Sequence, residues 1–168
     1  MLFFLIGFMG SGKSHWGKIW AADYKLGFID MDEDIEIKER KAVTEIFESK
    51  GEAYFRDVEA KMLRGYTSEV KNTIIACGGG TPCFHQNLEW MNEHGITIYL
   101  YCTPEEILRR LLKGQQKRPL INKLNQAELL FFIEKKMKER APYYSRANII
   151  LDNAAITEST FEEKILPY

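Results

Sequence analysis

Eight residues near the start of the chain, from Gly7 to Ser14, read G-F-M-G-S-G-K-S. They match the pattern G-x-x-x-x-G-K-S, in which a glycine-rich loop cradles phosphate groups. An apolar run at 2–6 precedes the loop, and Trp16 and Trp20 follow it at helical spacing. A strand, a loop and a helix in this order aim backbone N–H groups and a helix N-terminus at one point, which attracts anions. The residues predicted to hold a nucleoside triphosphate are Gly10, Ser11, Gly12, Lys13 and Ser14.

The composition is that of one globular domain. The 168 residues are 45% hydrophobic, and 23 basic side chains nearly balance 24 acidic ones, for a formal charge of −1. This balance favours neither a nucleic-acid-binding nor a membrane-binding surface. The apolar N-terminal run is short and lacks the basic region and cleavage site of a signal peptide, and no run approaches the ~18 apolar residues that span a bilayer. We therefore expect a cytoplasmic protein without nucleic-acid or membrane partners, and we expect it to be a monomer.

The cysteines Cys77, Cys83 and Cys102 form no even framework and no C-x-x-C pair. Free thiols in a reducing compartment are the simplest interpretation. A metal site built from Cys77, Cys83 and His85 is conceivable, but the spacing matches no zinc signature. Small buried side chains are therefore the favoured interpretation.

Short apolar segments that resemble strands alternate with helical segments. The strand segments lack a clean alternation of polar and apolar residues, which suits a parallel sheet buried on both faces. Alternating strands and helices are typical of an α/β fold with right-handed crossovers. The expected strands cover residues 2–6, 27–30, 73–77, 97–101 and 148–151.

The connection between the second and third expected strands, about 33–70, is longer than one crossover helix needs. A helix from Thr44 to Gly51 and another from Ala53 past Met62 would form a small lobe at the edge of the sheet, about 32–60.

Further along, Thr103 with Glu106 predicts a helix start with a capping box, and Asn125 is a plausible cap for a helix through Met137. Between these helices, the segment 113–124 begins with the polar and basic run K-G-Q-Q-K-R, which predicts a mobile lid over the phosphates.

Two aspartates follow the second expected strand, in the run F-I-D-M-D that ends at Asp32. Because alternate residues of a strand point the same way, Asp30 and Asp32 are both expected to face the phosphate loop. One carboxylate would support Mg²⁺ together with Ser14, and the other would meet the hydroxyl that accepts the phosphoryl group. The alternative is that one of them only caps a helix starting near Glu33.

Three glycines, Gly78, Gly79 and Gly80, directly follow the third expected strand. Glycines at that end of a strand indicate close approach of a ligand to the backbone or an unusual turn, and ligands bind at this edge of open α/β sheets. Arginine forks match carboxylate and phosphate oxygens. Three arginines are candidates, although their positions alone do not set them apart from surface residues: Arg56, Arg118 and Arg140.

In its order of motifs, the chain resembles the shikimate kinases over nearly its whole length. The glycine-rich loop is common to many kinases, whereas the motifs that follow it are more specific. These are D-M-D at 30–32, G-E-x-x-F-R at 51–56, the glycines at 78–80, R-P-L at 118–120 and R-A-P-Y at 140–143.

The resemblance implies a three-layer P-loop kinase fold, with a parallel sheet of five strands in the order 2-3-1-4-5 flanked by helices. It implies transfer of the γ-phosphate of ATP to the 3-hydroxyl of shikimate, with Mg²⁺, in aromatic amino acid biosynthesis. On the acceptor side, Asp32 would contact the hydroxyls, Arg56 and Arg140 would hold the carboxylate, and the glycines at 78–80 would line the ring.

On the nucleotide side, the resemblance implies that Lys13 and Arg118 balance phosphate charge in catalysis and that Ser14 and Asp30 serve Mg²⁺. Either Arg109 or Arg110 would lie near adenine.

Two residues depart from the family pattern. His15 stands where a small residue usually follows the serine of the loop, and Cys77 stands where Thr or Ser often precedes the glycines. Two other functions remain open. One is a kinase for another hydroxylated acid such as gluconate, and the other is a catalytically silent nucleotide-binding module.

Overall fold

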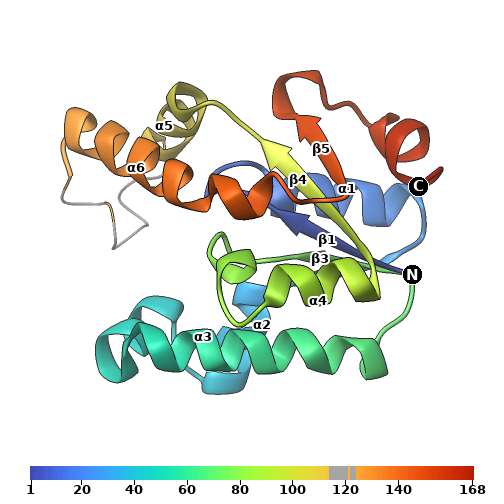
Figure 1. Cartoon of the computed structure of the whole chain (residues 1–168), viewed down its shortest axis with the longest axis horizontal. Coiled ribbons are helices and arrows are strands. Elements are labelled where there is room, and N and C mark those ends of the chain that lie inside the picture. The colour runs from blue at the N-terminus through green and yellow to red at the C-terminus, as the bar shows by residue number, and fades with distance from the viewer. Residues whose placement is uncertain (114–120, 122–123) are drawn as a thin grey trace.

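The computed structural model describes residues 1–113, 121 and 124–168. Its centre is a sheet of five parallel strands in the order β2-β3-β1-β4-β5, as expected (Figure 1). Each expected strand agrees with the observed one to within one residue at either end. The strands are β1 (Leu2–Ile6), β2 (Gly27–Asp30), β3 (Thr73–Ala76), β4 (Ile96–Tyr101) and β5 (Ile149–Asp152).

The register of the sheet brings several chain segments to one edge. Ala76 pairs with Leu5 on one side and with Asp30 on the other. The glycine-rich loop after β1, the aspartates after β2 and the glycines after β3 therefore leave the sheet side by side. This is the carboxyl edge, where open α/β sheets bind ligands.

Helices cover both faces of the sheet. They include α1 (Lys13–Asp23), α2 (Met31–Glu39), α3 (Val43–Glu69), α4 (Asn87–His94), α5 (Pro104–Leu112) and α6 (Gln126–Tyr144). Figure 1 shows α2 and α3 together on one side of the molecule, with α5 and α6 together on the opposite side. Short helical turns follow β3 (Thr81–Cys83) and β5 (Asn153–Ala155), and another lies near the C-terminus (Phe161–Ile165).

Successive side chains of β1 point to opposite faces of the sheet and enter separate cores. Phe4 is buried with Leu63 of α3 and Met91 of α4. Leu5 is buried on the other face with Trp20 of α1 and Phe161. Burial on both faces explains why the strands lack a polar–apolar alternation.

The connection between β2 and β3 is helical, but the expected start of its first helix was wrong. We placed that start near Glu33, and the argument from strand alternation treated Asp32 as if it continued the strand. The strand β2 ends at Asp30 as expected, but α2 begins at Met31, so Asp32 lies in the first turn of that helix. Asp30 caps α2, as the alternative interpretation of the two aspartates proposed. The Asp30 side chain accepts a hydrogen bond from the Asp32 backbone N–H, and this cap sets the start of the helix.

The break that we expected at Gly51 lies inside α3, which consists of two helices joined across a kink. At Gly51 the backbone has φ +82° and ψ 169°, so the chain kinks there and the helix resumes. The two expected helices are therefore the two halves of one kinked element, which continues to Glu69. Gly51 causes the kink, because its backbone has a conformation that other residues rarely adopt.

The caps of α5 and α6 were predicted with one error. Thr103 Oγ1 accepts a hydrogen bond from Glu106 N–H, as expected, but the Glu106 carboxylate binds Arg109 and Arg110 and does not complete a capping box. Asn125 and Glu128 do form a reciprocal box at the start of α6. Within the described part of the chain, the helices are too short or too polar to cross a bilayer.

Candidate active site

The glycine-rich loop wraps around the N-terminus of α1. Gly12 is the N-cap of this helix at φ +92°, and Gly10 has φ +81°. A side chain at either position would be strained, which explains why glycine occupies both. The N–H groups of the first turn of α1 consequently point into the loop, where an anion can bind.

The Lys13 ammonium lies inside this loop. Its Nζ donates hydrogen bonds to the carbonyl oxygens of Gly7 and Phe8, at 2.9 and 3.0 Å. Burial lowers the pKa of Lys13, and the negative charge of Asp32 partly offsets this effect. The cation is therefore held between the loop and the aspartates after β2.

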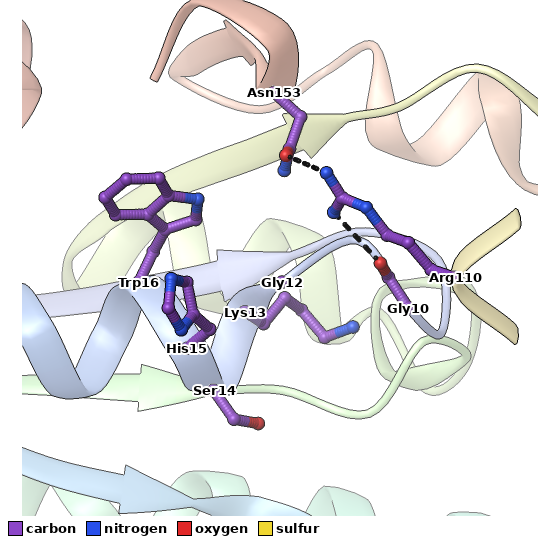
Figure 2. Close-up of a pocket in the computed structure, with 8 residues that line it drawn as sticks. All are labelled: Gly10, Gly12, Lys13, Ser14, His15, Trp16, Arg110 and Asn153. Atoms are coloured by element: carbon purple, nitrogen blue, oxygen red, sulfur yellow. Dashed lines mark hydrogen bonds between the residues drawn. The ribbon is translucent and has the colours of Figure 1, made fainter. Parts of the chain in front are cut away.

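A cavity of about 570 Å³ opens beside the loop and is lined by Gly10, Gly12, Lys13, Ser14, His15, Trp16, Arg110 and Asn153. Figure 2 shows the rings of His15 and Trp16 on one side and Arg110 on the other, with Asn153 above. Arg110 donates to Gly10 O at 3.2 Å and to Asn153 Oδ1 at 2.8 Å. The guanidinium of Arg110 thus joins the loop to the turn after β5.

The structure distinguishes the two neighbouring arginines of α5. Arg110 also lines a second cavity of about 340 Å³ that shares Asn153 with the first. Arg109 is exposed and pairs with Glu106 at 2.6 Å. Hydrogen bonds from both arginines lower the pKa of Glu106 to about 2. Only Arg110 of this pair therefore faces the cavities.

Ser14 and Asp30 bring a hydroxyl and a carboxylate together at the edge of the loop. Ser14 Oγ donates to Asp30 Oδ2 at 2.5 Å, while Asp30 Oδ1 caps α2. The capping role and the site role are thus compatible in one residue. A hydroxyl and a carboxylate fit Mg²⁺, which is usually held by one or two carboxylates together with phosphates and water. Within the described residues, no three His, Cys, Asp or Glu side chains cluster as a metal cage.

Asp32 is exposed as a residue, yet its carboxylate lies close to Gly78 and among the charges of Lys13, Glu59 and Asp30. Desolvation raises its pKa to about 6, and Lys13 partly opposes the rise. A Cβ added to Gly78 would lie 2.9 Å from Asp32 Oδ1, so this glycine is what lets the carboxylate approach β3. The group can therefore exchange a proton near neutral pH.

Arg56 on α3 is buried and held by two acids of its own helix. Its Nη1 donates to Glu59 Oε2 at 2.7 Å, and its Nη2 donates to Glu52 Oε1 at 3.0 Å. Glu59 is wholly buried and also accepts a hydrogen bond from Thr81 Oγ1, whereas Glu52 is largely exposed. A ligand can therefore displace Glu52 from Arg56 far more easily than it can displace Glu59.

The glycines after β3 lie against both arginines. A Cβ at Gly80 would come within 2.6 Å of Arg56 Nη2, and one at Gly79 within 3.0 Å of Arg140 Nη1. Tyr144 O–H donates to Gly79 O at 2.5 Å, and burial raises the pKa of this phenol, so it remains a donor. Arg140 also lies 5.3 Å from the centre of the Phe8 ring.

The three cysteines are free thiols. Cys77 and Cys102 are buried, and burial raises the pKa of each, so neither ionises at neutral pH. Cys83 is half-buried near Arg140 and Arg56, and its pKa is also raised by burial.

Most of the predicted site residues meet at the carboxyl edge of the sheet. The exception is Arg118, which lies outside the described residues together with most of the expected lid, 113–124. Sequence reasoning missed Glu59, Thr81, Tyr144, Trp16 and Asn153. For Glu59 a signal existed, because it lies three residues after Arg56 on a helix.

Known proteins resemble the whole chain. The family model for shikimate kinase matches residues 9–167. A shikimate kinase of Azobacteroides pseudotrichonymphae is 38% identical over 164 residues, which are 98% of this chain and 96% of that protein.

Two solved structures are similar to this chain in both fold and sequence. The shikimate kinase of Bacteroides thetaiotaomicron is 40% identical with a TM-score of 0.88, covering 91% of this chain and 86% of that one. The shikimate kinase of Acinetobacter baumannii, solved with shikimate, is 31% identical with a TM-score of 0.85, covering 98% and 90%. The chain therefore belongs to the shikimate kinase family.

Proposed function

We propose that this protein transfers the γ-phosphate of ATP to the 3-hydroxyl of shikimate, in aromatic amino acid biosynthesis. One observation carries the proposal. A Cβ at Gly79 would lie 3.0 Å from Arg140 Nη1, 3.3 Å from Gly7 O and 3.5 Å from Met9 N. An anion-binding arginine and the phosphate loop thus meet at the same glycine, as expected where a carboxylate-bearing acceptor and a triphosphate bind side by side.

On the acceptor side, Arg56 and Arg140 hold the carboxylate of shikimate. Charge-assisted bonds from arginine to a carboxylate are strong and directional. The backbone at 78–80 lines the ring, because the lack of side chains there leaves room beside both guanidinium groups.

On the nucleotide side, the loop residues Gly10, Ser11 and Gly12 and the ammonium of Lys13 bind the phosphates, with Arg118 as a further cation. Ser14 and Asp30 hold Mg²⁺, which when bound neutralises charge on the phosphate oxygens. Arg110 and the turn at Asn153–Ala155 take the base, because these residues connect the two cavities.

Asp32 orients the acceptor hydroxyl and accepts its proton. The hydroxyl oxygen bonds to the γ-phosphorus while the bond from that phosphorus to the bridging oxygen of ADP breaks. The proton moves to the Asp32 carboxylate and then to water. A pKa of about 6 suits this role, since the carboxylate is ionised at neutral pH but close enough to its pKa to take a proton.

The same proposal covers how the whole chain is organised and where it works. The chain works as one kinase domain and as a monomer in the cytoplasm. Residues 32–60 dock the acceptor, and the segment 113–124 closes over the phosphates to exclude water, which would otherwise compete as the acceptor.

An ADP-release assay with Mg²⁺ tests the proposal, with shikimate and gluconate compared at equal concentrations. We expect turnover with shikimate and little with gluconate, and no turnover without Mg²⁺. Turnover on gluconate alone would refute the choice of substrate. Binding of shikimate without turnover would instead support a silent nucleotide-binding module.

A further inference from the structure

An aromatic ring of unassigned role covers Arg56. The guanidinium carbon of Arg56 lies 4.5 Å from the centre of the Phe84 ring, which is closer than the Phe55 ring at 5.2 Å or the Phe47 ring at 5.7 Å. Phe84 is 37% exposed, so its ring lies at the protein surface while it contacts the buried Arg56. A cation over an aromatic face is attracted to it, and the attraction grows when water is excluded.

The backbone that presents Phe84 is strained. The two residues after it, His85 and Gln86, have φ values of +51° and +54°. Residues other than glycine rarely adopt this conformation, and two in succession cost free energy that the surrounding structure must offset. Such strain persists where neighbouring contacts fix the chain, and it is concentrated at functional sites.

The contacts that fix this turn come from α3, the helix that carries Arg56. Arg64 Nη2 donates to His85 O at 2.8 Å, and Arg64 Nη1 donates to Asn87 Oδ1 at 2.7 Å. His85 Nε2 lies 3.1 Å from Asp57 Oδ1, and Asp57 is the residue next to Arg56. The turn and the arginine are therefore tied to one rigid element.

The guanidinium is fixed in orientation as well as position. A Cβ built on Gly80 would lie 2.6, 2.8 and 2.8 Å from Nη2, Cζ and Nη1 of Arg56. Nearly equal distances to these three coplanar atoms mean that Gly80 packs above the guanidinium plane. Glu59 holds one edge of the group, and the exposed Glu52 occupies the edge that a ligand carboxylate can take over.

We propose that Phe84 is a positioning residue for the acceptor, acting through Arg56. In this role the ring keeps the guanidinium plane facing the acceptor site, so that its fork meets the carboxylate without reorganising. This inference rests on the proposed function, in which Arg56 binds the carboxylate of shikimate. It adds a specificity determinant that contacts the arginine and takes no part in the chemical step.

Steady-state kinetics of the full chain test the inference. Phe84→Leu keeps an apolar side chain and removes the ring, whereas Phe84→Tyr keeps the ring. Phe131→Leu makes the same change at a phenylalanine of α6 that is 67% exposed, and serves as the matched control. If Phe84→Leu does not fold, Phe84→Met provides the same comparison.

We expect Phe84→Leu to raise the KM for shikimate by about 3- to 30-fold, the range of a partly desolvated cation–π contact. The kcat and the KM for ATP should stay within about twofold, since Phe84 acts on ground-state binding of one substrate. Phe84→Tyr should restore the KM, and Phe131→Leu should match the wild type. An unchanged KM in Phe84→Leu, or a Phe84→Tyr variant as impaired as Phe84→Leu, would overturn the inference.

The methyl ester of shikimate separates action through Arg56 from general packing, because it lacks the charged carboxylate. Phe84→Leu should lower kcat/KM less for the ester than for shikimate. Equal losses on both compounds would show that the effect of Phe84 does not depend on the carboxylate, and would refute its role through Arg56. If the wild type fails to phosphorylate shikimate, the proposed function itself falls and this inference falls with it. If the wild type phosphorylates shikimate and Phe84→Leu leaves the KM for shikimate unchanged, only this inference fails and the proposed function stands.

Discussion

Arg56 and Glu59 form an ion pair at 2.7 Å in which the carboxylate is wholly buried and the arginine is 8% exposed. Glu59 also accepts a hydrogen bond from the Thr81 hydroxyl, so each of its two carboxylate oxygens has a hydrogen-bond donor. A buried pair adds little net stability over apolar residues, but losing one partner is costly because the other charge is left unpaired. Here the pair keeps a cation fixed beside the glycines at 79–80.

Glu59→Gln should therefore destabilise the fold by about 2–4 kcal/mol, because the Arg56 charge loses its buried partner. The melting temperature should fall by roughly 5–15 °C in a thermal unfolding scan. Glu52→Gln is the control, since this partner of Arg56 is 58% exposed and such pairs contribute about 0–1 kcal/mol. Equal melting temperatures for the two variants would contradict the importance of burial.

Gly80→Ala should weaken acceptor binding through a steric effect on Arg56. The backbone at Gly80 has φ −93°, so alanine is not strained there, but its Cβ would meet the guanidinium at 2.6 Å. We expect the KM for shikimate to rise about tenfold, as for the loss of a charge-assisted bond, with the KM for ATP little changed.

Gly51→Ala separates this effect from backbone strain. Gly51 has φ +82°, and a Cβ there would contact nothing within 4 Å. Alanine should cost about 1–2 kcal/mol of stability in denaturant unfolding and leave the KM for shikimate unchanged. A larger effect on that KM at Gly51 than at Gly80 would show that the steric argument is wrong.

The sequence predicts the sheet and most of the site because its signals are local. Apolar runs mark the strands, and glycines mark the loop at 7–14 and the turn at 78–80. The two aspartates were correctly expected at one edge, but for a wrong reason. Strand alternation does not extend to Asp32, and both carboxylates stay together because Asp30 caps the helix that carries Asp32.

Other contacts have no local signal. Asn153 Nδ2 donates to Ser11 O across 142 positions of the chain, and nothing in the sequence around either residue predicts this contact. The Arg110 contact with Asn153 depends on the same long-range packing. Phe84 faces Arg56 across 28 positions of the chain, and the residues after it, His85 and Gln86, have positive φ values that the sequence pattern did not lead us to expect.

The neighbouring arginines of α5 should differ in their effect on the nucleotide. Arg110→Ala removes the bonds to Gly10 O and Asn153 Oδ1, and we expect the KM for ATP to rise by about 10- to 100-fold, the range for hydrogen bonds of a charged group. Arg109→Ala removes only an exposed pair with Glu106, so the KM for ATP should stay within about twofold. The KM for ATP of each variant is measured by steady-state kinetics at saturating shikimate. A larger rise in Arg109→Ala than in Arg110→Ala would place the adenine base at Arg109.

The pKa of Asp32 predicts how activity depends on pH. If its carboxylate must be ionised to accept the proton, kcat/KM for shikimate should fall about tenfold per pH unit below about 6. Asp32→Asn should abolish this limb and lower kcat by about 10²- to 10⁴-fold, with the KM for ATP little changed. A pH profile with its acid limb near 4 would show that the pKa of the essential carboxylate is not raised, which would contradict this prediction.

The same shift predicts a stability effect of defined sign. Folding raises the pKa of Asp32 from 3.8 to about 6, so between these pH values the folded state binds more protons than the unfolded state. The contribution of this group to stability therefore declines as the pH rises through that window and stays low above it. Asp32→Asn lacks this decline, so its urea midpoint relative to the wild type should be higher at pH 7.5 than at pH 4. A midpoint difference that is the same at both pH values would show that the carboxylate is not desolvated in the folded state.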